Sequence, residues 1–149
     1  MEIKSINNKS EISKVLDLYI KVFAESPYNE IWSRESAYED LAESFESGRE
    51  YCLYAEEKGS IVGLVFCRQH TGYDGFHLII EDMAIDKKYR SRGVGTAMIK
   101  RLEELAREKH IASIDLLANI QAKASDFWKK LGYKPNGYIK LTKKILPLG

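Results

Sequence analysis

One continuous stretch, residues 76–110, most constrains the fold of this chain. It begins with FHLIIEDMAI at 76–85, a run that is apolar on both faces, as in a strand in the middle of a sheet. The turn RSRGVG follows at 90–95, and apolar residues then recur at helical spacing from about Thr96 to His110. A strand that passes through a glycine turn into an amphipathic helix indicates an α/β domain.

The glycine turn indicates an anion site. A helix N-terminus presents unpaired backbone N–H groups and the positive end of the helix dipole, so a turn that enters it can bind phosphate. Arg90 and Arg92 add cations, and Gly93 and Gly95 leave the backbone uncovered. Taken alone, this string fits a solvated glycine turn equally well. A dinucleotide-binding fold is disfavoured, because Met98 stands where its third glycine is needed.

The rest of the chain predicts alternating strands and helices. The expected fold is a single mixed α/β domain, residues 1–149, with a central mixed β-sheet of about six to seven strands flanked by about four helices. The expected elements are a strand at 1–6, a helix capped by Ser10, a helix opened by Ser33 and Ser36 and ended by Gly48, a hairpin through Lys58-Gly59, a strand at 113–117, a helix at 123–131 and a strand at 138–145.

Composition excludes several classes of protein. The apolar runs are too short to span a bilayer and the N-terminus lacks the apolar core of a signal peptide, so we expect a cytoplasmic protein without a membrane partner. The spacing of Cys52 and Cys67 suits neither a disulfide framework nor a metal site, and no metal is expected. If the hairpin turn has two residues, the two cysteines lie diagonally across it, with no activating histidine beside them.

The net charge of +1 conceals an asymmetry between the two halves of the chain. Residues 1–75 hold 14 acidic and 8 basic side chains, whereas residues 76–149 hold 8 acidic and 15 basic ones. Since the whole chain is near neutral and has no segment that combines aromatic and basic residues, we expect no nucleic-acid partner. A small polyanion fits the basic half better.

Two motifs resemble the GNAT superfamily of acetyl-CoA-dependent N-acetyltransferases. The family signature is [Q/R]-x-x-G-x-[G/A] between a central strand and a helix, and Arg90, Gly93 and Gly95 match its three fixed positions. The later family motif resembles residues 124–133, ASDFWKKLGY, with Ala124 before the aromatic pair. The order of elements extends the resemblance over nearly the whole chain.

The resemblance implies acetyl-CoA as cofactor and direct transfer to an amine in a ternary complex. The turn and the start of the helix would then hold the pyrophosphate, and the pantetheine arm would run along the end of the strand at 76–85, bonding its main chain. The residues that this assigns to cofactor binding are Met83, Ala84, Ile85, Arg90, Ser91, Arg92, Gly93, Val94, Gly95, Thr96, Asn119, Gln121, Phe127 and Lys130.

The reaction requires a base, because an alkyl amine with a pKa of about 10.4 is protonated at neutral pH. By resemblance Glu81 is the first candidate and Asp82 the second, although either carboxylate can instead pair with a nearby cation. Trp128 stands where family members commonly place the tyrosine that protonates the leaving thiolate, and indole cannot do this. A coenzyme A-binding sensor without turnover therefore remains the alternative function.

The acidic half suggests a cationic acceptor. Residues 25–57 hold ten acidic side chains against two arginines, and Tyr28 and Trp32 offer aromatic faces to a cation, with Glu81 as a further substrate contact. The pattern F-x-x-S-P-Y-N-x-x-W at 23–32 resembles aminoglycoside 6′-N-acetyltransferases. The expected acceptor is a primary amine of a small cationic molecule or peptide, although many of these acids also suit a solvated helix face. By resemblance, a homodimer is possible through the late strands.

Overall fold

The computed structural model describes residues 1–118 and 124–146. Their contacts divide the chain into two compact units, Met1–Leu117 and Ala118–Gly149. The expected single domain of 149 residues stays a prediction.

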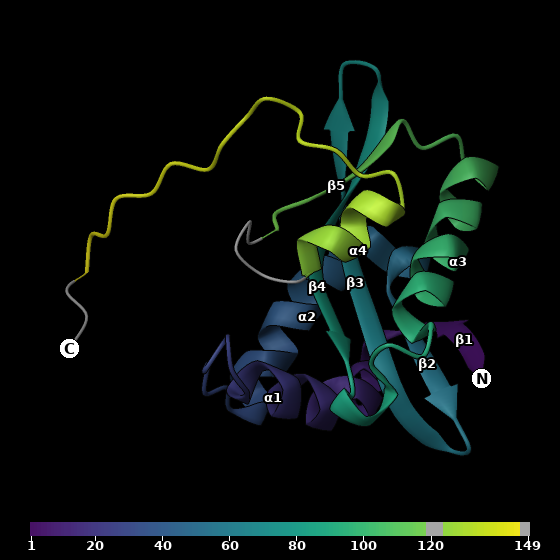
Figure 1. Cartoon of the computed structure of the whole chain (residues 1–149), viewed down its shortest axis with the longest axis vertical. Coiled ribbons are helices and arrows are strands. Elements are labelled where there is room, and N and C mark those ends of the chain that lie inside the picture. The colour runs from purple at the N-terminus through teal and green to yellow at the C-terminus, as the bar shows by residue number, and fades with distance from the viewer. Residues whose placement is uncertain (119–123, 147–149) are drawn as a thin grey trace. The chain divides into compact units, whose positions relative to one another are not determined.

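The first unit is an α/β fold around one mixed sheet of five strands in the order β1-β2-β3-β4-β5 (Figure 1). Neighbouring strands are antiparallel except for the parallel pair β4 and β5. The elements are β1 (Glu2–Ser5), a 3-10 helix (Lys9–Val15), α1 (Leu16–Ala24), α2 (Arg34–Gly48), a 3-10 turn (Arg49–Tyr51), β2 (Leu53–Glu57), β3 (Ser60–Gly72), β4 (Gly75–Ile85), a 3-10 turn (Lys87–Tyr89), α3 (Val94–Glu108) and β5 (Ser113–Leu116).

Helices cover the two faces of this sheet (Figure 1). Leu64 of β3 and Ala84 of β4 pack with α1 and α2 in the main hydrophobic core. The neighbouring Gly63 lies on the other face, where a Cβ atom would stand 2.8 Å from the Met98 sulfur of α3. Because side chains alternate along a strand, β4 directs its even-numbered residues near the C-terminal end at α1 and α2.

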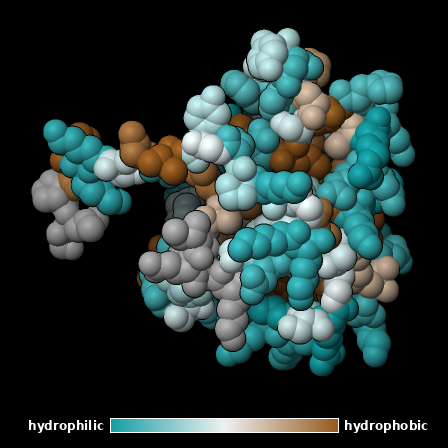
Figure 2. Space-filling view, turned by 45° about the horizontal axis from the view of Figure 1, so that its top comes forward, coloured by the Kyte–Doolittle hydropathy of each residue, from teal (hydrophilic) through white to brown (hydrophobic). Residues whose placement is uncertain are grey.

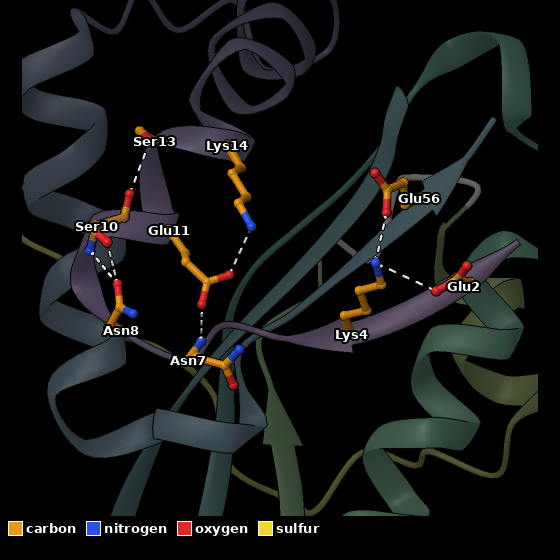
Figure 3. A network of polar contacts seen from close by, with 9 residues as sticks. All are labelled: Glu2, Lys4, Asn7, Asn8, Ser10, Glu11, Ser13, Lys14 and Glu56. Atoms are coloured by element: carbon orange, nitrogen blue, oxygen red, sulfur yellow. Dashed lines mark hydrogen bonds and ion pairs between the residues drawn. The ribbon is translucent and has the colours of Figure 1, made fainter. Parts of the chain in front are cut away.

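The chain enters the first helical segment through a network of polar contacts (Figure 3). Asn8, not the expected Ser10, caps it, since the Asn8 Oδ1 accepts from the Ser10 backbone N–H at 3.0 Å. The Glu11 carboxylate accepts from the Asn7 backbone N–H at 3.1 Å and pairs with Lys14 at 2.9 Å. The local cap therefore lies two residues before the predicted one, and the segment opens as a 3-10 helix before α1.

Two local predictions are confirmed. Ser33 and Ser36 form a capping box at the start of α2, each side chain accepting from the other's backbone N–H. Glu57 pairs with Ser60 across a two-residue turn, in which Lys58 and Gly59 have φ of 50° and 80°. Two left-handed residues match the twist of the hairpin that joins β2 to β3.

A β-bulge interrupts β4 before its end. Phe66 of β3 pairs with Asp82, but the next residue, Cys67, pairs with Ile80, so Glu81 is the additional residue. Bulges bend a strand and redirect side chains, and they are frequent beside active sites. The bulge therefore falls at the two acidic residues that interrupt the apolar run.

The cysteines are free and buried, as expected from the sequence. Cys52 donates from its thiol to the Cys67 carbonyl at 3.3 Å instead of forming a disulfide. Burial raises the pKa of the Cys52 thiol to about 12 and that of Cys67 well above its ordinary value. Both thiols are therefore inert at neutral pH.

The second unit contains α4 (Ala124–Lys130). The prediction of a strand at 138–145 is wrong. Residues 138–146 have no regular structure, and in the part of the chain that the structure describes the sheet has five strands instead of six to seven. A strand requires a hydrogen-bonded neighbour, and a local apolar pattern does not supply one. The apolar side chains of this segment are exposed (Figure 2): Tyr138, Ile139, Leu141, Ile145 and Leu146.

Candidate active site

The glycine turn between β4 and α3 leaves a helix N-terminus open. Ser91 and Gly93 have φ of 63° and 83°, in the left-handed region. Gly93 is the N-cap of α3, and no side chain of the described residues caps this helix. A Cβ atom at Gly93 would meet no other described residue within 4 Å. The backbone N–H groups of Val94, Gly95 and Thr96 in the first turn are therefore available to an anion.

The two arginines of the turn differ in their partners. Arg90 turns back to β4, where its Nε donates to the Ile85 carbonyl at 3.1 Å and its guanidinium lies 3.5 Å from the Glu25 carboxylate. The Arg92 guanidinium lies 5.7 Å from the centre of the Tyr89 ring. Both arginines are exposed, but only Arg90 ties the turn to the strand.

The end of β4 has a free edge. β5 pairs only with residues His77 to Ile80, so beyond the bulge no strand of the described residues pairs with β4 on the side away from β3. Met83 and Ile85, predicted to bond the pantetheine arm, lie in this stretch, and Ala84 between them is buried in the core. Unpaired main-chain groups of this kind accept an extended ligand as an additional strand.

Glu81 and Asp82, the two predicted candidates for the base, have different environments. The Glu81 carboxylate pairs with the Arg68 Nε at 2.5 Å, and its side chain is 38% exposed. The Asp82 Oδ2 is buried and has no hydrogen-bond partner among the described residues. A buried carboxylate oxygen without a partner is costly and calls for a ligand or a proton.

Several causes, of which burial is the largest, raise the pKa of Asp82 from its ordinary 3.8 to about 8. The Asp40 carboxyl group of α2 contributes to this rise, and the negative charges of Glu81 and Glu30 act in the same direction. A carboxyl group with this pKa is part ionised at neutral pH and exchanges protons readily in that range.

An aromatic cluster, defined as Tyr19, Phe23, Tyr28 and Trp32, lies beside the two aspartates. The Tyr19 hydroxyl donates to the Asp40 carboxylate at 2.6 Å. The Tyr19 ring contacts Phe23 at 4.8 Å and the edge of Trp32 at 5.3 Å, and Tyr28 contacts Phe23 at 5.0 Å between ring centres. The predicted substrate residues Tyr28 and Trp32 thus belong to the same cluster.

The predicted residues of the later motif belong to the second unit or lie outside the described residues. Asn119 and Gln121 lie outside them. Phe127 is half-buried and Lys130 exposed. The Trp128 ring contacts Phe127 at 4.9 Å and Tyr133 at 5.2 Å, which fits a packing role for the indole. In the part of the chain that the structure describes, no group of acidic, histidine and cysteine side chains is suited to a metal ion.

Sequence reasoning overlooked Tyr19 and Asp40 as site residues. Asp40 was only one of the ten acidic side chains counted at 25–57, and Tyr19 had no predicted role. A signal existed for Asp40, since it lies three residues after Ala37 and four before Ser44, both buried. An acidic residue at these spacings lies on the buried side of its helix, where a carboxylate is rare unless it has a partner.

Comparison with known proteins agrees with this geometry. Residues 16–133 match the family model described as "Acetyltransferase (GNAT) family". The chain is 27% identical over 141 residues to streptothricin acetyltransferase A of Bacillus subtilis, covering 87% of this chain and 79% of that protein.

Solved structures share the fold. Aminoglycoside 6′-N-acetyltransferase AAC(6′)-IG of Acinetobacter haemolyticus has a TM-score of 0.73 at 16% identity, covering 99% of this chain and 100% of that one. Aminoglycoside N-acetyltransferase AAC(6′)-Iy in complex with CoA has a TM-score of 0.74 at 14% identity, covering 96% and 93% of the two chains. No helix among the described residues has the length and apolar character needed to cross a membrane.

Proposed function

The chain belongs to the acetyltransferase (GNAT) family, and from that premise we propose that it acetylates a primary amine of a small cationic molecule or peptide. The observation that carries the proposal is the buried carboxylate oxygen of Asp82 beside the bulge of β4, which has no hydrogen-bond partner among the described residues. The proposal puts the donor side at the free edge of β4 and the acceptor side at the aromatic cluster.

The donor side fits acetyl-CoA, which the family uses and which supplies an acetyl group activated as a thioester. The uncapped N-terminus of α3 and the open space at Gly93 suit its pyrophosphate. The unpaired main chain of Met83 to Ile85 suits the amides of its pantetheine arm. Because Arg90 contacts Ile85 and Glu25, we propose that it stabilises the conformation of the turn. We propose that Arg92 binds the negatively charged phosphates.

We assign the role of general base to Asp82. The acceptor amine arrives as an ammonium ion and must lose one proton before its nitrogen can attack. The Asp82 carboxylate accepts that proton: an N–H bond breaks, an O–H bond forms, and the nitrogen lone pair becomes free. Glu81 is assigned to the ion pair with Arg68, because its carboxylate already has a cationic partner in solvent.

Direct transfer, without an acyl-enzyme, is supported by the state of the two cysteines. Both are buried and have raised thiol pKa values, so neither supplies a thiolate at neutral pH. The amine is then the nucleophile itself.

The acceptor class is supported by charge and by the relatives. Asp40, Glu30 and Glu81 surround Asp82 with negative charge, which favours a cation over a neutral or acidic acceptor. Tyr28, which is half-exposed, and Trp32, which is half-buried, add aromatic faces that an ammonium group can contact. The names of the relatives, which refer to streptothricin and aminoglycosides, suggest small polycationic amines.

An amine panel tests the proposal. Purified protein is incubated with acetyl-CoA and either a polyamine, an aminoglycoside, a streptothricin or a lysine-rich peptide, and thiol release is followed together with the mass of the acceptor. We expect amine-dependent thiol release and an acceptor heavier by one acetyl group. Tight binding of coenzyme A without thiol release for any amine would reject the transferase and support the sensor alternative.

A further inference from the structure

A polar cluster lies where β5 begins to pair with β4, outside the candidate active site. This His77 cluster is defined as Asp74, His77, Ser113 and Asp115. The His77 Nε2 lies 2.5 Å from the Asp74 Oδ1, in the hairpin turn between β3 and β4. The His77 Nδ1 lies 2.7 Å from the Ser113 Oγ and 3.3 Å from the Asp115 Oδ2, both on β5. One imidazole ring of β4 therefore contacts the hairpin turn and β5 together.

The hydrogen bonds of the His77 cluster assign a charge to the ring. Ionised carboxylates only accept hydrogen bonds, so the ring nitrogen that faces Asp74 and the one that faces Asp115 must both donate. The Ser113 hydroxyl donates to the Asp115 Oδ1 at 3.0 Å, which leaves the Ser113 oxygen free to accept from the His77 Nδ1. An imidazole with an N–H group on each nitrogen is an imidazolium ion.

The same hydrogen bonds disfavour a second catalytic centre. Serine, histidine and aspartate side chains in contact can form a nucleophilic relay, but the histidine must then accept the serine proton at an unprotonated nitrogen. The Nδ1 of His77, which contacts Ser113, already carries a proton. The His77 cluster is therefore suited to connecting segments of the chain and not to acyl chemistry.

The neighbouring strand β3 defines the position of the ring. His70 pairs with His77 in the register of β3 and β4, and Arg68, two residues earlier, is paired with Glu81. A Cβ atom at Gly72 would stand 2.6 Å from the His77 Nε2. The imidazole thus lies close against the end of β3.

α1 and α2 also pack against β4, and the charges on them that act there lie near its C-terminal end. Lys21 of α1 lies 3.6 Å from the carboxylate of Asp86, which follows β4. Asp40 of α2 acts on Asp82. These groups therefore belong to the region of the candidate active site and not to the His77 cluster.

Among the described residues, the charges that act on His77 are those of Asp74 and Asp115. Both raise the pKa of the imidazole above its ordinary 6.5, the hydrogen bond to Asp74 first and that to Asp115 second. The native state therefore holds a proton that the unfolded state loses above about pH 6.5. The stabilisation is complete below this pH and is lost as pH rises through the folded pKa.

The pairing of β5 with β4 is short. The ladder has four residue pairs, from His77 with Ser113 to Ile80 with Leu116. Parallel pairs are also slightly less stable per residue than antiparallel ones. The His77 cluster lies at the first pair of this ladder, so it can contribute a large share of what fixes β5.

We propose that the charged ring of His77 is an ionic bridge that fixes β5 to β4 and to the hairpin turn, so that the attachment of β5 weakens as pH rises. The bridge acts on the segment beside the candidate active site, because the ladder ends at Ile80, one residue before the bulge at Glu81. This inference goes beyond the proposed function and does not depend on it.

Nitrogen-15 NMR of the His77 imidazole in the full chain tests the charge. We expect both ring nitrogens to be mainly protonated at pH 6.5. In Asp74→Asn the titration midpoint should move to lower pH, since a carboxylate partner is lost. The matched control is Glu39→Gln, which removes an exposed negative charge from α2 and should leave the midpoint unchanged. A wild-type midpoint at or below pH 6.5 would overturn the proposal.

Hydrogen exchange of the backbone amides of β5 tests what the charge does. The exchange rates in His77→Gln are divided by the wild-type rates at the same pH, which cancels the intrinsic pH dependence of exchange. At pH 6 we expect a ratio of about three to ten, falling toward one by pH 9, because only the charged ring forms the bridge. Asp115→Asn should behave in the same way, and the amides of β2 should give a ratio near one throughout. A β5 ratio of one at pH 6, or an equal ratio at pH 6 and pH 9, would overturn the ionic bridge, whatever the activity of the protein.

Discussion

The proposed donor and acceptor sides of this site are built in different ways. The donor side consists of main chain, namely the first turn of α3 after Gly93 and the unpaired edge of β4 from Glu81 to Ile85. The acceptor side consists of side chains from separate elements: Tyr19 of α1, Asp40 of α2, Asp82 of β4 and Trp32 between the helices. Only the donor side corresponds to contiguous segments of the sequence.

This difference has a physical reason. A backbone N–H is the same at every residue, so one turn and one strand edge can bind a constant ligand with few sequence requirements beyond glycine. Recognition of a particular amine needs charges and aromatic rings at particular places, and these come together only when distant segments pack. Four predictions test whether main-chain groups bind the donor and side chains bind the acceptor.

The largest effect is expected at the base. Asp82→Asn should lower kcat by about 10²- to 10⁴-fold, because a general base contributes a factor of this order. Steady-state thiol release measures it. The comparison variant is Glu81→Gln, which breaks only an exposed ion pair and should lower kcat less than about threefold, since such pairs contribute about 1 kcal/mol or less. Equal losses in the two variants would remove the distinction between the carboxylates.

The stability of the protein should depend on pH through the same residue. The folded pKa of Asp82, about 8, lies above its ordinary 3.8, so between these values the native state holds a proton that the unfolded state has lost. Stability therefore falls as pH rises from about 4 to 8 and this loss ends above 8. The free energy of unfolding of wild type and Asp82→Asn is measured by denaturant titration at pH 4 and pH 9. Between these two pH values it should fall by about 1 to 3 kcal/mol less in the variant than in the wild type. An identical pH dependence in both proteins would mean that Asp82 is not desolvated.

On the donor side, Gly93→Ala should weaken coenzyme A binding by about five- to tenfold. The residue at this helix start has φ of 83°, and a side chain there is strained by about 1 kcal/mol even though the space is open. Isothermal titration with coenzyme A measures the change, and the KM for the amine should stay constant. Gly59→Ala is the matched control, because it places the same strain at φ of 80° in the hairpin turn. Weaker coenzyme A binding in Gly59→Ala as well would mean that strain alone, and not the turn, causes the effect.

The smallest effect is expected in the aromatic cluster. Trp32→Leu should raise the KM for a cationic acceptor by about two- to fivefold, since a cation–π contact at a partly exposed ring contributes about 0.5 to 1 kcal/mol. Affinity for coenzyme A should not change. Tyr73→Leu, at a fully exposed ring on the turn between β3 and β4, serves as the aromatic control. A KM that is unchanged in Trp32→Leu would place the acceptor away from this cluster.

The elements that the sequence predicted correctly depend on local interactions. The Ser33 and Ser36 box and the Lys58-Gly59 turn each need only residues within a few positions of one another, whereas α3 begins at Val94, two residues before the predicted Thr96. Capping and turn chemistry act at this range, so their patterns are legible in the sequence.

The features that the sequence did not predict depend on distant partners. Residues 138–145 have apolar side chains at strand-like spacing, yet no strand forms because no neighbour pairs with them in the described residues. Asp40 and Asp82 are 42 positions apart, and neither pattern indicates that Asp40 acts on the pKa of Asp82. The proposal of Asp82 before Glu81 as base likewise rests on the bulge in β4 and on Arg68, which no single-residue pattern reveals.

The pH dependence of kcat for two acceptors of different basicity tests the assignment of Asp82 most directly. With amines whose own pKa values differ by about two units, the acidic limb should have the same midpoint for both, because it reports the ionisation of Asp82 in the complex. A midpoint that follows the pKa of the acceptor, or an acidic limb that persists in Asp82→Asn, would contradict the assignment.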